Sequence, residues 1–255
     1  MANTGKSPRK TKKLTNEEKR DIAYEALMAE PVANLMDKLT IHLKCKTANQ
    51  KEFVKLIKSR DIIICSGFPG TGKTYVACAA ALDILKHDPK IKKIVLVKSV
   101  TTIEDEEIGY LKGTMEEKMK PFMYSFIHNF EKIIGKQWVE SLKQAGIIEE
   151  MPLAYIRGIN IDEAVVIIDE AQNITKKKAK SIMTRLGENS KMIFLGDTEQ
   201  IDLKGAKVKE SSLDFMVRRF KDKPDFGTIS FGEEDIVRHR LIKTILEGFD
   251  ESNES

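Results

Sequence analysis

The chain has 255 residues, of which 41% are hydrophobic, so it can form one large α/β domain or two small ones. Its 43 Lys and Arg residues nearly balance its 39 Asp and Glu residues, which excludes a histone-like excess of positive charge and leaves only local patches for contact with nucleic acid. No apolar run approaches the ~18 residues of a membrane span, and the N-terminus lacks the apolar core of a signal peptide, so we expect a soluble protein without membrane contact.

The N-terminal part divides into an arm and a helical segment. Residues 1–14 are basic and nearly devoid of apolar side chains, so we expect a disordered arm that either binds nucleic acid or is simply solvated. Residues 15–46 are predicted to form an N-terminal helical segment, in which Thr15 and Glu18 make a capping box and Pro31 stops the first helix.

A helix is predicted over residues 47–58, where Phe53 and Ile57 share one face. Gln50 lies near its start, just before the strand that follows. Its amide can donate to and accept from adenine, which is the role of a glutamine at this place in helicase-like ATPases. The alternative is a glutamine that is merely exposed at the start of a helix, and the sequence does not decide between the two.

The central feature is a glycine-rich loop between a strand and a helix. Residues 61–66 are mostly apolar and predict a buried parallel strand, and the alanine-rich residues 75–85 predict a helix. The loop GFPGTGKT between them matches the Walker A pattern, in which glycines turn backbone N–H groups toward a phosphate. Lys73 can reach the β- and γ-phosphates, and the Thr74 hydroxyl can hold Mg²⁺. The predicted nucleotide-binding residues are Gln50, Gly67, Phe68, Pro69, Gly70, Thr71, Gly72, Lys73, Thr74 and Tyr75.

The next segments are a second strand and a helical insert. Residues 93–98 predict a strand with Lys98 at its carboxyl end, where ligands bind in an open parallel sheet. Residues 114–146 predict a helical insert, in which Pro121 indicates a kink or a break. The methionine and aromatic side chains of the insert recur at helical spacing, which favours core packing over a platform for stacked bases.

A further buried strand is predicted over residues 164–168, and it delivers Asp169 and Glu170 to its carboxyl end. This is a Walker B arrangement, in which Asp169 is the predicted metal ligand together with Thr74. Glu170 is the predicted catalytic base, because an acid beside the metal ligand can orient or deprotonate the attacking water.

The next predicted strand is followed by a candidate sensor of the γ-phosphate. Residues 191–195 are apolar, and Gln200 follows them at the same edge of the sheet, where an uncharged amide can rearrange when the phosphate leaves. The remaining expected segments are helices over residues 175–186, 210–220 and 233–246, a strand over residues 226–231, and an acidic tail over residues 250–255.

Together these strings resemble the PhoH-like family of P-loop ATPases. The likeness rests on GFPGTGKTYVACAAAL, PLAYIRG, VVIIDEAQNIT, MTRLGENSKMIFLGDTEQIDL and DIVRHRLI, which occur in the family's order and cover roughly residues 47–249. Short phage-encoded members are the most similar in type. Lys98 and Ser99 stand where members often have Arg-Pro, and Arg240 stands where a proline is common.

The resemblance implies an α/β fold, a RecA-like P-loop NTPase core with a mostly parallel sheet flanked by helices. It implies Mg²⁺-dependent ATP hydrolysis in the cytoplasm of a bacterial or infected host cell, coupled to binding or remodelling of single-stranded RNA or DNA. The alternatives are an ATP-dependent switch or scaffold without motor activity and a nucleotide kinase. An Asn-Lys-x-Asp guanine motif is absent from the sequence, which favours ATP over GTP.

A chain of this length has room for only one such core, whereas ATP in related enzymes is contacted by two. Helicase-type ATPases place ATP between two cores, and an arginine from the second core is worth ~10³ to 10⁵ in rate. We therefore expect a homo-oligomer, such as a hexameric ring. Arg238 is the favoured arginine, and the other candidates are Arg157, Arg185, Arg219 and Arg240.

Overall fold

The computed structural model describes residues 32–99, 115–197, 200 and 211–237. The predicted segments at residues 1–14, 15–29 and 250–255 lie outside these ranges, as do Arg238 and Arg240. Among the described residues, no helix is long and apolar enough to cross a membrane.

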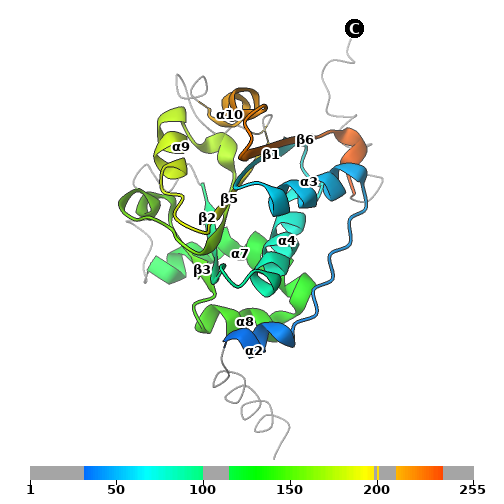
Figure 1. The fold of residues 1–255 in the computed structure, drawn as a ribbon, viewed down its shortest axis with the longest axis vertical. Helices are drawn as coiled ribbons and strands as arrows, with labels where there is room; N and C mark the ends of the chain where they lie inside the picture. Colours follow the sequence, from blue (N-terminus) through cyan, green and yellow to red (C-terminus); the bar gives the residue numbers. More distant parts are fainter. Residues whose placement is uncertain (1–31, 100–114, 198–199, 201–210, 238–255) are drawn as a thin grey trace, which may run out of the picture.

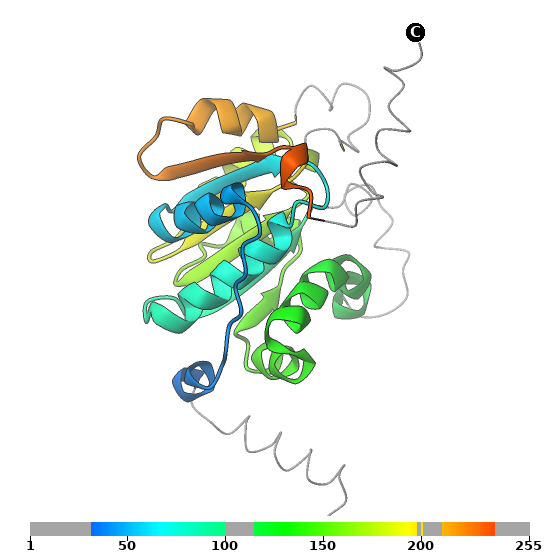
Figure 2. The same cartoon turned by 90° about the vertical axis from the view of Figure 1, so that its right-hand side faces the viewer.

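The fold is a six-stranded parallel sheet with helices on both faces (Figures 1 and 2). Its strand order is β3-β2-β4-β5-β1-β6, and every adjacent pair is parallel. The strands are β1 (Ile62–Gly67), β2 (Lys93–Lys98), β3 (Ile148–Glu150), β4 (Ala164–Asp169), β5 (Lys191–Leu195) and β6 (Phe226–Phe231). This arrangement confirms the predicted RecA-like α/β core.

The α-helices also follow the predicted order where they are described. They are α2 (Val32–Asp37), α3 (Ala48–Ser59), α4 (Lys73–His87), α7 (Met115–Ile134), α8 (Lys136–Gln144), α9 (Lys176–Met183) and α10 (Leu213–Phe220). Short 3₁₀ turns η1 (Leu153–Gly158), η2 (Ala171–Asn173) and η4 (Glu233–Asp235) complete the described elements.

Each central strand is buried on both faces, because alternate side chains enter two separate cores. On β1, Ile63 and Cys65 pack with α3, α4, α7 and α8, whereas Ile62 and Ile64 pack with η1, α9 and α10. Buried parallel strands are therefore apolar at nearly every position, which is why the sequence shows runs rather than alternation.

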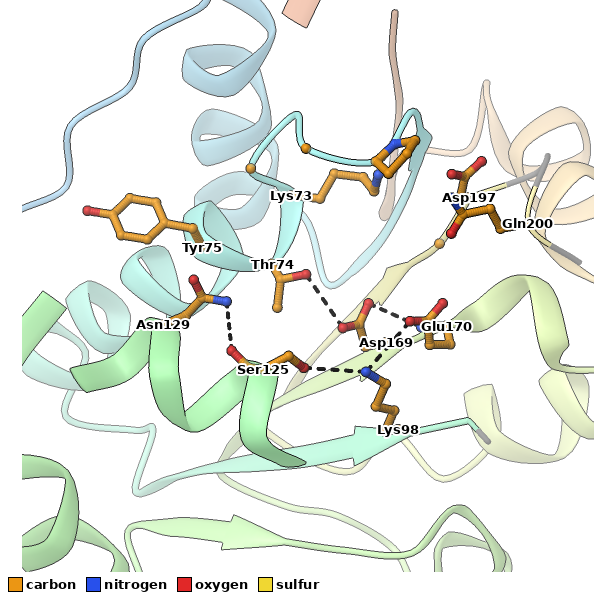
Figure 3. Close-up of a pocket in the computed structure, with 14 residues that line it drawn as sticks. Lys73, Thr74, Tyr75, Lys98, Ser125, Asn129, Asp169, Glu170, Asp197 and Gln200 are labelled. Carbon is orange, nitrogen blue, oxygen red and sulfur yellow. Dashed lines mark hydrogen bonds and ion pairs between the residues drawn. The ribbon is translucent and has the colours of Figure 1, made fainter. Parts of the chain in front are cut away.

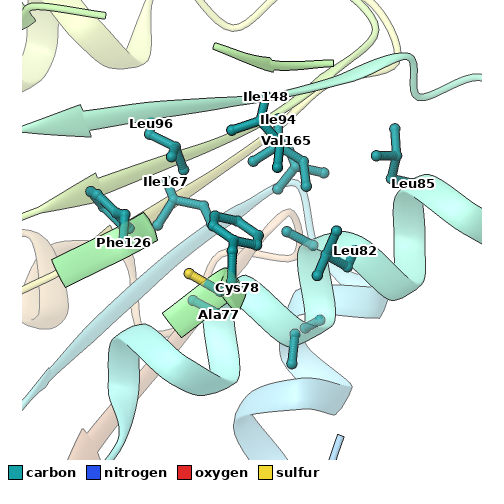
Figure 4. Packing of buried hydrophobic residues seen from close by; sticks show 14 of the residues in the cluster. Ala77, Cys78, Leu82, Leu85, Ile94, Leu96, Phe126, Ile148, Val165 and Ile167 are labelled. Carbon is teal, nitrogen blue, oxygen red and sulfur yellow. The ribbon is translucent and has the colours of Figure 1, made fainter. Parts of the chain in front are cut away.

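Helix α4 is buried around most of its circumference, and its small side chains make this possible. Ala77, Cys78 and Ala81 are fully buried, so that the helix lies close to the sheet on one side and to α3 and α7 on the others. Figure 4 shows Phe126 of α7 beside Cys78 of α4 and Ile167 of β4. This packing fixes the direction of α4 and with it the position of the glycine loop at its start.

The helical insert is α7 followed by α8, and its apolar stripe is core. Met119 and Phe126 of the predicted stripe are at most 3% exposed, which confirms packing for these two, whereas Phe122 and Ile127 are half-buried. Met123 and Phe130 are also at most 3% exposed. The break that Pro121 indicated is absent, since α7 continues through this residue. Buried neighbours on both sides of Pro121 hold the helix in place.

The predicted helix over residues 233–246 is wrong at its beginning. Within residues 233–237, where the description of this segment ends, the 3₁₀ turn η4 forms instead, and Ile236 is already extended with φ −65° and ψ 113°. The Asp235 carboxylate accepts from the side chain of Asn49 and from the backbone N–H of Gly232, and the N–H of Val237 donates to the Gly70 carbonyl. These contacts tie the segment to α3 and to the glycine loop, so that a helix cannot start there.

Strand β3 is absent from the predicted elements. Ile148–Glu150 is a three-residue edge strand, too short to show a period. Helix α2 lies within the helical segment predicted over residues 15–46, whereas residues 39–46 are not helical.

The close approach of β1 to β6 at Gly67 can be tested by substitution of this glycine. Its φ is +137°, and a Cβ would lie 2.3 Å from the Phe231 carbonyl oxygen. We expect Gly67→Ala to lower the free energy of unfolding by more than ~3 kcal/mol, because strain and a backbone clash add. Denaturant unfolding measures this loss.

Gly146→Ala is the matched control, because Gly146 also has positive φ (+67°) but nothing within 4 Å of its Cβ position. Its cost should be the ~1 kcal/mol of a left-handed residue alone. Equal losses in the two variants would contradict the close approach at Gly67.

Candidate nucleotide site

The glycine loop connects β1 to α4 at the carboxyl edge of the sheet. Gly70 and Gly72 have φ of +82° and +81°, which only glycine adopts readily. Thr71 is buried, and its hydroxyl donates to the Phe68 carbonyl at 2.9 Å. The loop is thus held by its own hydrogen bonds, with the start of α4 directed toward its centre.

Gln50 is buried rather than exposed, which overturns the simpler of its two interpretations. Its Nε2 donates to the Thr71 carbonyl at 2.9 Å, and its Oε1 accepts from the Lys46 N–H at 2.6 Å. A Cβ on Gly72 would lie 3.0 Å from the same Nε2. Gln50 therefore attaches α3 to the glycine loop.

Lys73, Thr74 and Asp169 meet although they come from distant parts of the chain. The Lys73 ammonium donates to the carbonyls of Gly67 and Phe68 at 2.6 and 2.8 Å. The Thr74 hydroxyl donates to Asp169 Oδ2 at 3.5 Å across the end of β5. The Walker A and Walker B residues are therefore neighbours, as the sequence predicts.

Glu170 leaves β4 in a left-handed conformation, with φ 57°, that points it along the edge of the sheet. Its Oε1 lies 3.6 Å from Lys98 Nζ, and Lys98 also donates to the Ser125 hydroxyl of α7 at 3.4 Å. The Asn129 amide, one turn further along α7, donates to the Ser125 carbonyl at 2.8 Å (Figure 3). Helix α7 thereby becomes one wall of the site.

Gln172 connects the residues that follow β4 to those that follow β5. It is fully buried, and its Nε2 donates to Glu170 Oε2 at 2.8 Å and to the Gln200 carbonyl at 2.9 Å. Its Oε1 accepts from the Asp197 N–H at 3.1 Å. One amide therefore fixes the predicted base relative to the predicted sensor.

These side chains enclose an open pocket of about 380 Å³. It is lined by nine residues that the sequence predicts for the site: Pro69, Gly70, Gly72, Lys73, Thr74, Tyr75, Asp169, Glu170 and Gln200. It is also lined by Lys98 and Asp197, which the sequence places at the carboxyl edge of the sheet, and by three residues to which the sequence does not point: Ser125, Asn129 and Gly196.

Four predicted residues do not line the pocket. Gly67, Phe68, Thr71 and Gln50 instead hold the loop through the contacts described above. Of the arginines, Arg157 and Arg219 are exposed, Arg185 is half-buried, and Arg238 and Arg240 lie outside the described residues.

Ser125 and Asn129 were missed because they belong to the insert, whose core spacing gave no sign of a site. Gln172 was visible only as part of the string DEAQN. A polar residue between buried apolar neighbours was the available signal for it, because such a residue needs partners.

Burial opposes the charged forms of two residues of the site, Asp169 and Lys73. Desolvation raises the pKa of Asp169 from 3.8 to about 6, with the negative charge of Glu170 as the next cause. Desolvation lowers the pKa of Lys73 against the opposing effect of nearby carboxylates. Oxygen donors from Asp169 and Thr74 that converge in such a place suit Mg²⁺, which prefers hard oxygen ligands.

Comparison with known proteins finds one family. The model described as "PhoH-like protein" matches residues 42–250. The PhoH-like protein of Bacillus subtilis (strain 168) is 40% identical over 212 residues, covering 83% of this chain and 65% of the relative. Protein PhoH of Escherichia coli (strain K12) is 34% identical over 202 residues, covering 78% and 56%. The chain thus spans two thirds or less of these relatives' length.

Solved structures with a similar arrangement include the large terminase of a thermophilic bacteriophage, with a TM-score of 0.47 and 12% identity over 79% of this chain and 49% of that one. The Pif1 helicase of Candida albicans has a TM-score of 0.38 and 16% identity over 80% of this chain and 44% of its own.

The raised pKa of Asp169 predicts a pH-dependent cost. Between pH 4 and 6 the unfolded chain loses this proton while the folded protein keeps it, so folding stability falls as pH rises. Above pH 6 the full cost of up to about 3 kcal/mol is present. We expect Asp169→Asn to be more stable than the wild type at pH 7.5 by up to this amount.

Thermal or denaturant unfolding without nucleotide or metal, at pH 4 and at pH 7.5, measures the difference. Most of the gain should disappear at pH 4, where the folded carboxyl is protonated and the unfolded one, with a pKa of 3.8, is only about half ionised. A variant that is no more stable than the wild type at pH 7.5 would show that the Asp169 charge is not penalised.

The hydrogen bonds of Gln172 predict a second loss of stability. Gln172→Met keeps the volume but leaves the Asp197 N–H without its amide acceptor and Glu170 without its amide donor, which should cost about 2 to 4 kcal/mol of unfolding free energy. Gln144→Met on the exposed end of α8 is the control and should stay within about 0.5 kcal/mol of the wild type. Similar stabilities of the two variants would contradict the bridging role.

Proposed function

Because this chain belongs to the PhoH-like family, we propose that it is a Mg²⁺-dependent ATPase that couples hydrolysis to the binding or remodelling of RNA or DNA. The proposal rests on one observation above all: the Thr74 hydroxyl lies 3.5 Å from Asp169, and Lys73 and Glu170 face the same pocket. The proposed place of action is the cytoplasm.

Lys73, Thr74 and Asp169 are the proposed binding groups. The loop N–H groups and the start of α4 favour an anion, and Lys73 adds a mobile ammonium for the β- and γ-phosphates. Thr74 and Asp169 would hold Mg²⁺, which neutralises phosphate charge when bound. Gln50 and Tyr75 are proposed to act on the adenine side, Gln50 through the loop that it supports.

Glu170 is the proposed base for the attacking water. In the proposed hydrolysis, the water oxygen bonds to the γ-phosphorus as the bond between this phosphorus and the ADP oxygen breaks. Glu170 takes up a proton of the water, and this proton then passes to solvent or to the released phosphate. Gln172 holds one oxygen of Glu170, which orients the other. Gln200, at the pocket edge, is the proposed sensor of the γ-phosphate.

The proposed polymer contact begins at α9, one turn beyond the acidic residues. Lys176, Lys177 and Lys180 are exposed there, and such a basic face attracts a phosphate backbone. We further propose a homo-oligomer in which an arginine from a second copy completes the site, with Arg238 favoured and Arg157 and Arg219 as exposed alternatives.

Glu170→Gln tests the proposed function most simply. We expect ATP hydrolysis to fall by at least about 100-fold, because the amide cannot accept the water proton, while ATP still binds. Steady-state hydrolysis with and without single-stranded RNA and DNA, beside equilibrium ATP binding, measures both effects.

Wild-type hydrolysis should rise with one of the polymers, and this stimulation should weaken with salt. Specific activity should also rise with protein concentration if a second copy supplies the arginine. Wild-type hydrolysis that neither polymer changes would favour the ATP-dependent switch, and an unimpaired Glu170→Gln variant would exclude Glu170 as the base.

A further inference from the structure

The outer side of α7 carries a stacked ring pair that the nucleotide pocket does not use. Tyr124 is 67% exposed, more than any other large hydrophobic side chain of the described residues. Its ring is nearly parallel to that of His128, with 9° between the planes and 5.7 Å between the centroids. Lys120, one turn before Tyr124, is also exposed. We call Lys120, Tyr124 and His128 the α7 platform.

The exposure of Tyr124 is not a by-product of poor packing. The inner face of the same helix buries Met119, Met123, Phe126 and Phe130 almost completely, and Tyr124 is not part of that core. With one face toward His128 and 67% of the residue exposed, Tyr124 can present its other face to a ligand.

A hollow of about 480 Å³ lies beside the platform, lined by Lys120, Pro121, Tyr124, Ile127, Lys143 and Glu150. Lys143 and Glu150 form an ion pair at 2.5 Å, so their charges offset each other at the wall. The ammonium group of Lys120 is then the positive charge available to a ligand in the hollow. The hollow therefore offers a flat ring, apolar walls and one ammonium group.

From this chemistry we propose that the α7 platform binds unpaired bases of a single-stranded polynucleotide, with Tyr124 stacking on a base and Lys120 contacting a phosphate. The inference rests on the proposed function and adds the place of binding. Stacking suits single strands because bases in a duplex already cover one another, and it tolerates any base because each has a π-face.

The platform lies on the same helix as two residues that line the nucleotide pocket. Ser125 and Asn129, the residues after Tyr124 and His128, line the nucleotide pocket on the other side of α7. The Ser125 hydroxyl lies 3.4 Å from Lys98 Nζ, which lies 3.6 Å from Glu170 (Figure 3). A polynucleotide bound to Tyr124 would therefore contact the same helix that contacts Lys98 beside Glu170.

The test is Tyr124→Ala in the full chain, with Tyr155→Ala as the matched control. Tyr155 is 56% exposed but belongs to η1, which packs on the opposite face of the sheet. We expect Tyr124→Ala to weaken binding of a fluorescent single-stranded oligonucleotide about 5- to 100-fold and to lose polymer-stimulated hydrolysis, with basal hydrolysis unchanged. Tyr155→Ala should bind as the wild type does. Oligo(U) and oligo(dT) probes distinguish RNA from DNA.

Lys120→Gln separates charge from stacking. It should reduce the slope of log affinity against log salt concentration by about 0.7, the value for one phosphate contact on a single strand, whereas Tyr124→Ala should leave that slope unchanged. Wild-type protein that binds neither probe would overturn the nucleic-acid part of the proposed function and the platform with it. Wild-type binding that Tyr124→Ala does not weaken would overturn the platform alone, and would assign Tyr124 to another partner.

Discussion

The parallel alignment of β1, β5 and β4 is the constraint on which the candidate site depends. Ile63 of β1 is paired with Ile193 of β5, which is paired with Ile167 of β4, so these strands end at the same edge of the sheet. Lys73 and Thr74 follow β1, and Asp169 ends β4. Only this register brings a loop and an acid from distant parts of the sequence to within hydrogen-bond reach.

The same alignment places charged groups where desolvation makes their charged forms unfavourable, and the packed core must hold them there. Desolvation penalises the charged forms of buried Asp169 and half-buried Lys73, and the left-handed backbone of Glu170 adds strain of the order of 1 kcal/mol. Strands covered on both faces and a helix as closely packed as α4 hold these groups where an isolated loop would not. The free-energy cost of placing these groups is therefore linked to the close packing of the strands and α4 around them.

Much of this could be predicted from the sequence, because local chemistry determines it. The glycine loop, the strands over residues 93–98, 191–195 and 226–231, and the acidic end of β4 are each specified by a contiguous run. Contacts between distant segments were not predictable in this way. Gln172 needed the positions of Glu170, Asp197 and Gln200, and the contribution of α7 needed its place against β2. Residues 233–237 have a helical sequence pattern, yet their tertiary contacts to Asn49 and Gly70 override that preference.

Titration of the protein with ATP by calorimetry, in Mg²⁺ and in EDTA, tests most directly whether the strand ends form a nucleotide site. We expect binding that Mg²⁺ strengthens, that Lys73→Ala removes and that Lys90→Ala, on an exposed loop, leaves intact, with similar melting temperatures for all three proteins. Undiminished binding by a folded Lys73→Ala variant would contradict the assignment of this pocket to ATP.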